Sequence, residues 1–135
     1  METIDNVGGV TIATRGIVAL VLGLVANFVI VQAVFTFDLT GTTEHIEFWS
    51  TTILTTIGVT GATVVYALIA WRSARPNWLF VRVAVVAFLL SFLPNIGLIL
   101  SDGPATDEVF VLMSMHIPPT VTCVGSLTGR LSEKL

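Results

Sequence analysis

Four long stretches without Asp, Glu, Lys or Arg divide this chain, and they limit its fold more than any other feature. They cover residues 16–37, 48–71, 83–101 and 109–129. A helix rises 1.5 Å per residue, so about 20 apolar residues are enough to cross the ~30 Å hydrocarbon core of a bilayer. The sequence therefore predicts an all-α membrane protein with four transmembrane helices.

Composition agrees with that fold class. Apolar residues make up 54% of the chain and charged residues only 11%, whereas about 25% charged residues is ordinary for a soluble domain. Since the connections are short, we expect residues 1–135 to form one membrane domain, an up-down-up-down bundle. No length remains for a separate soluble catalytic domain. The net charge of −3 argues against a nucleic-acid partner.

The two membrane sides of the predicted bundle differ in their charged residues. One side holds all the basic residues, which are Arg15, Arg72, Arg75, Arg82, Arg130 and Lys134. The loops on the other side hold acidic residues only, which are Asp38, Glu44, Glu47, Asp102, Asp107 and Glu108. Because cytoplasmic loops carry the excess of Lys and Arg, we expect both termini to be cytoplasmic, in a multi-pass protein of the cell membrane.

Small residues recur along each span and are expected to mark the faces that pack together. Helices in lipid associate through close contact of small side chains and through interhelical hydrogen bonds. On this basis Gly23, Gly58 and Ala87 are interpreted as packing positions. The single cysteine, Cys123, lies in an apolar run and is interpreted as a small buried hydrophobe.

Polar side chains lie at a similar depth in all four spans. His116, Asn95 and Gln32 each lie about 8–10 Å below the predicted outer end of their span, at 1.5 Å per residue. Polar groups in hydrocarbon need partners, water or a ligand, so this layer predicts a small pocket open to the exterior. The pocket candidates are His116, Asn95, Gln32, Thr55, Asn27 and Ser91. The simpler alternative is that His116 only bonds to a neighbouring helix.

Prolines lie close to the same layer. Pro94, Pro118 and Pro119 have no amide hydrogen, so each leaves a backbone carbonyl one turn earlier without its helical partner. We therefore expect two kinked helices near His116 and Asn95. Carbonyls freed in this way are tolerated at membrane depth only when they are buried in protein or face water.

Metal, cofactor and enzyme functions receive little support. Glu44, His45 and Glu47 offer ligand atoms in one outer loop, but their spacing is not characteristic of a metal site, so no metal is predicted. Haem would need a second intramembrane histidine opposite His116, and no cofactor is expected. No Ser, His and Asp are spaced as a nucleophilic triad, and an enzyme that uses His116 with a bound cofactor remains the least favoured hypothesis.

Several short motifs resemble those of an uncharacterised family of small four-helix membrane proteins from actinobacteria and haloarchaea. They are Arg15-Gly16, Ala26-Asn27, Ser91 with Pro94, and Met115-His116. The resemblance implies four helices in one domain and no established activity. It draws attention to Asn27, Ser91, Pro94 and His116 without giving them roles. The excess of Arg over Lys and the acidic exterior are also typical of halophilic proteins.

The sequence favours a small binding or accessory membrane protein with a polar pocket around His116 in the outer half of the bundle. Its expected partners are the lipid bilayer and, through homo-oligomers or a larger membrane complex, other proteins. The alternative is an oligomeric channel or a carrier for a small solute or protons, because imidazole exchanges protons near neutral pH.

Overall fold

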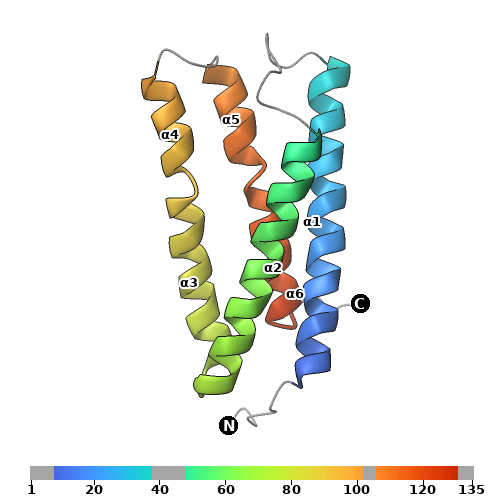
Figure 1. The fold of residues 1–135 in the computed structure, drawn as a ribbon, viewed down its shortest axis with the longest axis vertical. Coiled ribbons are helices and arrows are strands. Elements are labelled where there is room, and N and C mark those ends of the chain that lie inside the picture. Colours follow the sequence, from blue (N-terminus) through green and yellow to red (C-terminus); the bar gives the residue numbers. More distant parts are fainter. Residues whose placement is uncertain (1–7, 38–47, 102–105, 131–135) are drawn as a thin grey trace.

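The computed structural model describes residues 8–37, 48–101 and 106–130, and in these parts all regular secondary structure is helical. Figure 1 shows the arrangement. The helices are α1 (Gly9–Phe37), α2 (Phe48–Arg72), α3 (Pro76–Leu90), α4 (Leu93–Leu100), α5 (Thr106–Ser114) and α6 (Ile117–Leu127).

Four helical stretches are long and apolar enough to cross a membrane. They are Gly9–Phe37, Phe48–Arg72, Pro76–Gly97 and Val109–Leu127. The third stretch combines α3 with most of α4, and the fourth combines most of α5 with α6. The predicted all-α chain with four membrane-length helices is thereby confirmed.

Two helices begin earlier in the chain than the spans predicted from the sequence. Helix α1 starts at Gly9 rather than at residue 16, because Arg15 does not end the helix: its guanidinium reaches the Leu127 carbonyl oxygen of α6, 3.2 Å away. Helix α3 starts at Pro76 rather than at residue 83. Proline is favoured in the first turn of a helix, and Arg82 stays within α3, where its guanidinium stacks 3.6 Å from the centre of the Trp78 ring.

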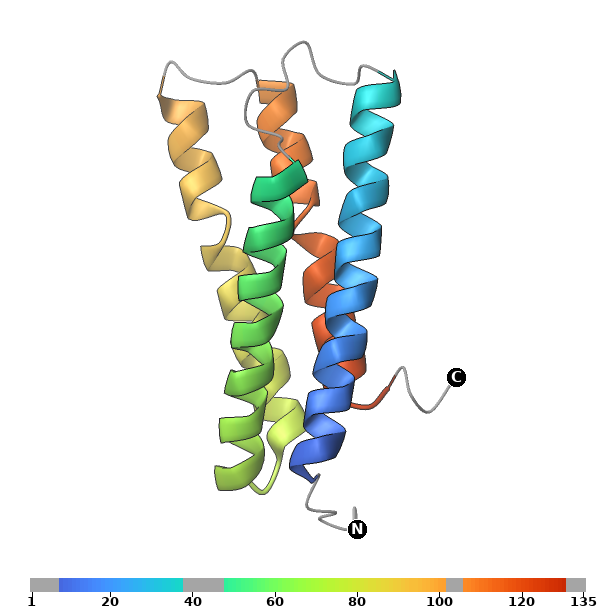
Figure 2. The ribbon, with the colours of Figure 1, turned by 45° about the vertical axis from the view of Figure 1, so that its right-hand side comes forward.

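Helix α1 packs most extensively against α2 and α6 (Figures 1 and 2). Its contact face carries the buried small residues Gly16, Ala19 and Gly23. A methyl group placed on Gly16 would lie only 2.6 Å from the Thr63 side chain of α2. The close approach of α1 and α2 therefore depends on glycine at this position, as expected for helices that associate in lipid.

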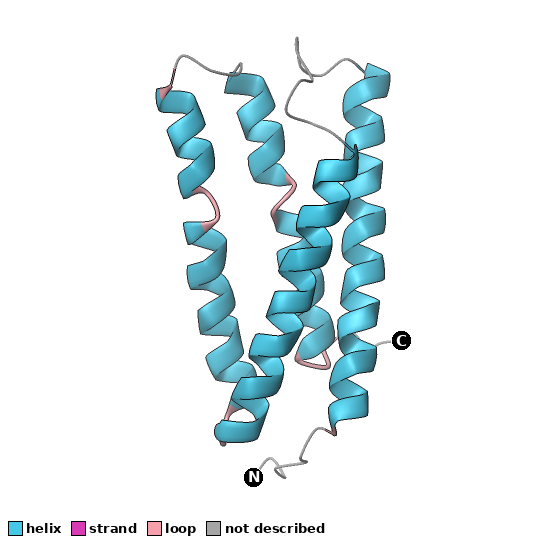
Figure 3. Ribbon diagram, viewed as in Figure 1, coloured by secondary structure: helices cyan, strands magenta, loops and turns pink. Residues whose placement is uncertain are grey.

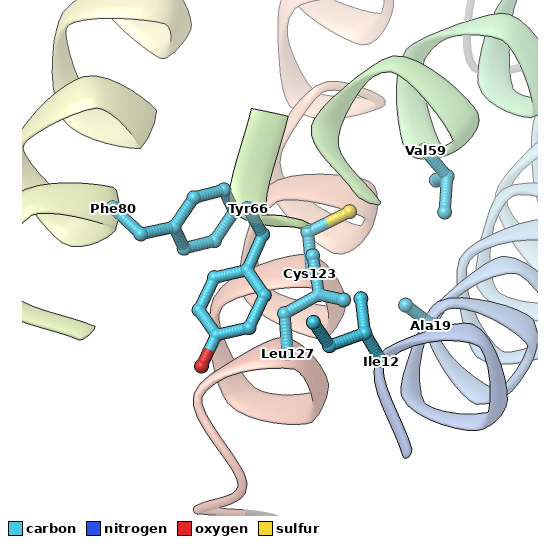
Figure 4. Close-up of a cluster of buried hydrophobic side chains, with 7 residues drawn as sticks. All are labelled: Ile12, Ala19, Val59, Tyr66, Phe80, Cys123 and Leu127. Carbon is cyan, nitrogen blue, oxygen red and sulfur yellow. The ribbon is translucent and has the colours of Figure 1, made fainter. Parts of the chain in front are cut away.

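The main cluster of buried apolar side chains joins all the long helices toward one end of the molecule (Figure 4). Tyr66 of α2 lies at its centre, fully buried, with its ring edge-on to Phe80 of α3 at a centroid distance of 5.1 Å. A second, smaller cluster lies further along α1, where Val31 and Val34 pack against Met115. The first cluster comprises Ile12, Ala19, Val59, Tyr66, Phe80, Cys123 and Leu127.

Polar contacts close the bundle below the main cluster, and we call them the basal network. The Tyr66 hydroxyl donates to Oδ1 of Asn77 at 2.7 Å, and Nδ2 of Asn77 donates to the Thr128 carbonyl at 3.3 Å. Together with the bond from Arg15 to Leu127, these contacts tie the start of α1, the end of α2, the start of α3 and the end of α6 to one another.

Candidate functional site

A groove of about 380 Å³ lies between α2, α3 and α6, with contributions from α1 and from the end of α5. Its volume is within the range of about 300–1,000 Å³ that is usual for small-molecule sites. None of the described residues that line it is Asp, Glu, Lys or Arg. Its polar lining residues are Asn27, Thr51, Thr55, Ser91, His116 and Thr120.

The groove exists because α2 and α3 present small side chains to each other. Gly58 and Ala62 line it from α2, and Ala84 and Ala87 line it from α3. A methyl group on Gly58 would meet no atom within 4 Å. Gly23 is buried against α2 and α6 as predicted, but the interpretation of Gly58 and Ala87 as packing positions is wrong. Their small size leaves space between the helices instead of bringing the helices together.

The lining changes character along the groove. Polar side chains gather around Thr51 and Thr55 of α2 and around Ser91 and His116 of the two broken helices. Toward the basal network the walls are apolar, with Val65, Phe80 and Cys123. The groove is therefore amphipathic along its length, with one polar and one apolar end.

The mouth of the groove opens on the side of the bundle. Leu54, Val65 and Val83 line the groove and are also exposed, by 66%, 37% and 38% respectively. These residues lie within stretches long enough to cross a membrane. In a bilayer, apolar side chains exposed on such helices contact lipid chains.

Both broken helices are interrupted next to the polar end. Figure 3 shows the two interruptions at a similar height, one between α3 and α4 and one between α5 and α6. A serine at each break bonds back to the preceding helix. The Ser91 hydroxyl donates to the Phe88 carbonyl at 2.6 Å, and the Ser114 hydroxyl donates to the Val111 carbonyl at 2.7 Å.

The prolines lie just beyond these breaks. Pro94 occupies the first turn of α4, and Pro118 and Pro119 occupy the first turn of α6. A proline in the first turn removes an amide that has no helical partner in any case, so it favours a new helix start. The structure thus contains two helix starts where the sequence analysis expected kinks in continuous helices.

His116 lies in the second break and is held from two sides. Its Nδ1 lies 2.8 Å from the Leu112 carbonyl oxygen, and its ring meets Phe92 edge-on at a centroid distance of 6.0 Å. A carbonyl oxygen can only accept, so Nδ1 carries the hydrogen of this bond. In the described part of the chain Nε2 has no hydrogen-bond partner, and the side chain is half-buried on the groove wall.

Asn27 of α1 reaches the groove through its contact with α2. Its Nδ2 donates to Oγ1 of Thr55 at 3.0 Å, in a bond that joins the two helices. Asn27 is only 3% exposed, and its Oδ1 has no hydrogen-bond partner in the described structure. An unpaired buried amide oxygen costs about 1–3 kcal/mol. A group that donates a hydrogen bond to this oxygen would remove that cost.

Four of the six predicted pocket residues line the groove, namely Asn27, Thr55, Ser91 and His116. Gln32 does not line the groove, because this side chain is exposed on α1. At about 100° per residue, five residues turn Gln32 roughly 140° away from Asn27. Asn95 is buried, but it lies beyond the first break and does not line the groove.

The sequence analysis missed two polar lining residues, Thr51 and Thr120. Thr51 lies four residues before Thr55, and Thr120 lies four residues after His116. Residues four apart in a helix share one face. This four-residue spacing could have predicted both residues from the sequence. Thr120 also donates to the His116 carbonyl at 2.8 Å, which secures the first turn of α6.

The weak metal candidates Glu44, His45 and Glu47 lie outside the described residues. Within the described ranges no group of three or more His, Cys, Asp and Glu side chains could hold a metal ion. Comparison of the chain with protein-family models, with curated proteins and with solved structures finds no match. The groove is therefore the basis for assigning a function.

Proposed function

We propose that this protein is an integral membrane protein that binds a small amphipathic molecule, which enters the groove from the bilayer. The observation that carries the proposal is that Asn27, which lines the groove, has a buried Oδ1 without a hydrogen-bond partner in the described structure. The sideways mouth, with its exposed leucine and valine residues, gives such a molecule a route that stays within the membrane. This proposal keeps the role of a binding or accessory protein that the sequence favours, and it assigns the predicted pocket to this groove.

The proposal includes an up-down-up-down bundle in the cell membrane with both termini in the cytoplasm. Arg72 and Arg75 lie at the end of α2 and in the connection to α3, close to the basal network. By the excess of basic residues on cytoplasmic sides, this end faces the cytoplasm. The polar end of the groove then lies in the outer half of the membrane. Membership of the four-helix family and assembly into oligomers remain predictions.

A matched pair of glycine substitutions tests the proposal. Gly58 and Gly61 both lie in α2, both are exposed, and a methyl group on either would meet no atom within 4 Å. Only Gly58 lines the groove. Gly58→Leu should therefore fill the groove without forcing the helices apart, and Gly61→Leu should add the same side chain to the outer surface.

The probe is 1-dodecanol, because its chain and its hydroxyl match the apolar and the polar end of the groove. Native mass spectrometry of the protein in mild detergent should show a saturable one-to-one adduct with the unchanged protein and with Gly61→Leu. Gly58→Leu should lose most of it. Circular dichroism and melting confirm that both variants fold. Absence of the adduct from the unchanged protein, or equal adducts in both variants, would overturn the proposal.

Transport of a small solute or of protons is the second candidate, favoured by the two helix breaks beside the polar end of the groove. Discontinuous helices often form the substrate sites of transporters. Proton flux into liposomes, compared between the unchanged protein and His116→Ala, tests this candidate. Equal background flux in both would eliminate transport through His116.

A further inference from the structure

We infer that the groove selects a neutral molecule with one hydrocarbon chain and a head group that donates a hydrogen bond, through an O–H or N–H, to Oδ1 of Asn27. This inference rests on the proposed function and names the class of ligand. Three properties of the groove lead to it: its length and volume, the hydrogen-bonding character of its polar end, and its lack of charge.

The length and volume of the groove fit one hydrocarbon chain. On α2 the lining runs from Thr51 to Val65, which is about 21 Å at 1.5 Å per residue. The volume of about 380 Å³ is in the range of sites for small molecules. A single extended hydrocarbon chain is therefore a suitable occupant.

Two acceptors at the polar end have no hydrogen-bond donor in the described structure. Oδ1 of Asn27 is buried and unpaired, and Nε2 of His116 has no partner in the described structure. Nδ1 already carries the hydrogen bonded to Leu112, so Nε2 of the neutral ring is an acceptor. A head group that only accepts hydrogen bonds would leave the buried amide oxygen of Asn27 unsatisfied. A head group with an O–H or N–H satisfies it.

Charge argues for a neutral ligand. No described residue that lines the groove is Asp, Glu, Lys or Arg. An ionised group that leaves water for such a site finds no opposite charge, and its desolvation is not compensated. Fatty acids and amines are therefore expected to bind less well than an alcohol of the same chain length.

The experiment compares two probes that differ in one hydrogen-bond donor. 1-Dodecanol can donate and accept, whereas its methyl ether can only accept. Both are titrated by native mass spectrometry against the unchanged protein, Asn27→Leu and Asn95→Leu. Asn95 is the matched control, because it is also buried with an unpaired side-chain atom, Nδ2, but lies outside the groove.

With the unchanged protein and with Asn95→Leu, the alcohol should bind about tenfold more tightly than the ether, the ratio expected for one hydrogen bond. Asn27→Leu should reduce this ratio to about one. Equal affinity of alcohol and ether for the unchanged protein would overturn the inference and leave the proposed function standing. If neither probe binds the unchanged protein, the proposed function fails as well.

A second measurement does not depend on variants that must fold. The Asn27 side-chain amide signal in a nitrogen-15 NMR spectrum of the unchanged protein should shift on adding 1-dodecanol and should shift much less on adding the ether. Equal shifts with the two probes would contradict the assignment of Asn27 as the acceptor.

Discussion

The rings of Phe92 and His116 meet edge-on, with their centroids 6.0 Å apart, at the point where two helices break. Phe92 belongs to the turn between α3 and α4, and His116 belongs to the turn between α5 and α6. This contact joins the two turns beside the polar end of the groove. Beyond them α4 and α5 pack on each other, so the two short helices extend from the breaks as a pair.

The position of the imidazole hydrogen is the first prediction. Because Nδ1 of His116 lies 2.8 Å from the Leu112 carbonyl oxygen, the neutral ring should carry its hydrogen on Nδ1. Nitrogen-15 NMR of protein labelled at histidine distinguishes the two tautomers by their ring chemical shifts. A His45→Gln variant assigns the signals. Finding the hydrogen on Nε2 would contradict the bond to Leu112.

Gly16→Ala should destabilise the bundle. The added methyl group would lie 2.6 Å from the Thr63 side chain, whose hydroxyl is held by the Val59 carbonyl. Overpacking of this kind costs about 1–3 kcal/mol. The free energy of unfolding in detergent measures the effect. Gly61→Ala serves as the control, since its methyl group meets open space and alanine favours helix by up to ~1 kcal/mol. Equal effects of the two changes would contradict the close contact of α1 and α2.

Removing the charge of Arg15, which lies in α1 and contacts the end of α6, should also lower the stability of the protein. The Arg15 guanidinium donates to the Leu127 carbonyl at 3.2 Å, and a cation at a helix C-terminus stabilises it. Arg15→Met should therefore reduce the free energy of unfolding by about 1–2 kcal/mol. The control is Arg75→Met, because Arg75 is exposed in the connection between α2 and α3. A loss as large in the control would mean that general charge, not this contact, is responsible.

The Tyr66 and Asn77 side chains should be energetically coupled. The Tyr66 hydroxyl donates to Asn77 at 2.7 Å next to the main apolar cluster. A double-mutant cycle of Tyr66→Phe and Asn77→Ala, measured by unfolding, should give a coupling of about 1 kcal/mol. Tyr66→Phe combined with Arg75→Met should be additive. Strict additivity in the first pair would show that the bond contributes nothing to stability.

The sequence was sufficient for the number of spans and for part of the candidate site. Long uncharged runs force helices across a bilayer whatever their packing, so four membrane-length helices could be predicted. Depth along a span also follows from residue number, which is why Asn27, Thr55, Ser91 and His116 could be considered together, and all four line the groove. The prediction did not consider which face of the helix each side chain occupies, and Gln32 lies on a face of α1 that does not line the groove.

The remaining features depend on tertiary structure. Asn95 lies four residues after Ser91, so a continuous helix would place both on one face, but the turn at Ser91 and Phe92 separates them. Gly58 and Ala87 are small residues typical of packing positions, and only the folded structure shows that they line a groove. Small residues in the sequence do not tell whether two helices meet there or leave space.

Because the groove opens on the side of the bundle, its occupancy by the proposed ligand depends on the concentration of ligand in the membrane and not on the concentration in water. Leu54 and Val83 line the groove and are exposed on membrane-length helices, so under the proposed function a ligand that enters there is in equilibrium with the lipid phase and not with the aqueous solution. Its relevant concentration is its mole fraction among the lipids, which for a membrane-soluble molecule far exceeds its concentration in water. A modest intrinsic affinity is then enough for saturation. Under the proposed function, the molecule that the purified protein contains should therefore change with the lipid composition of the host cell.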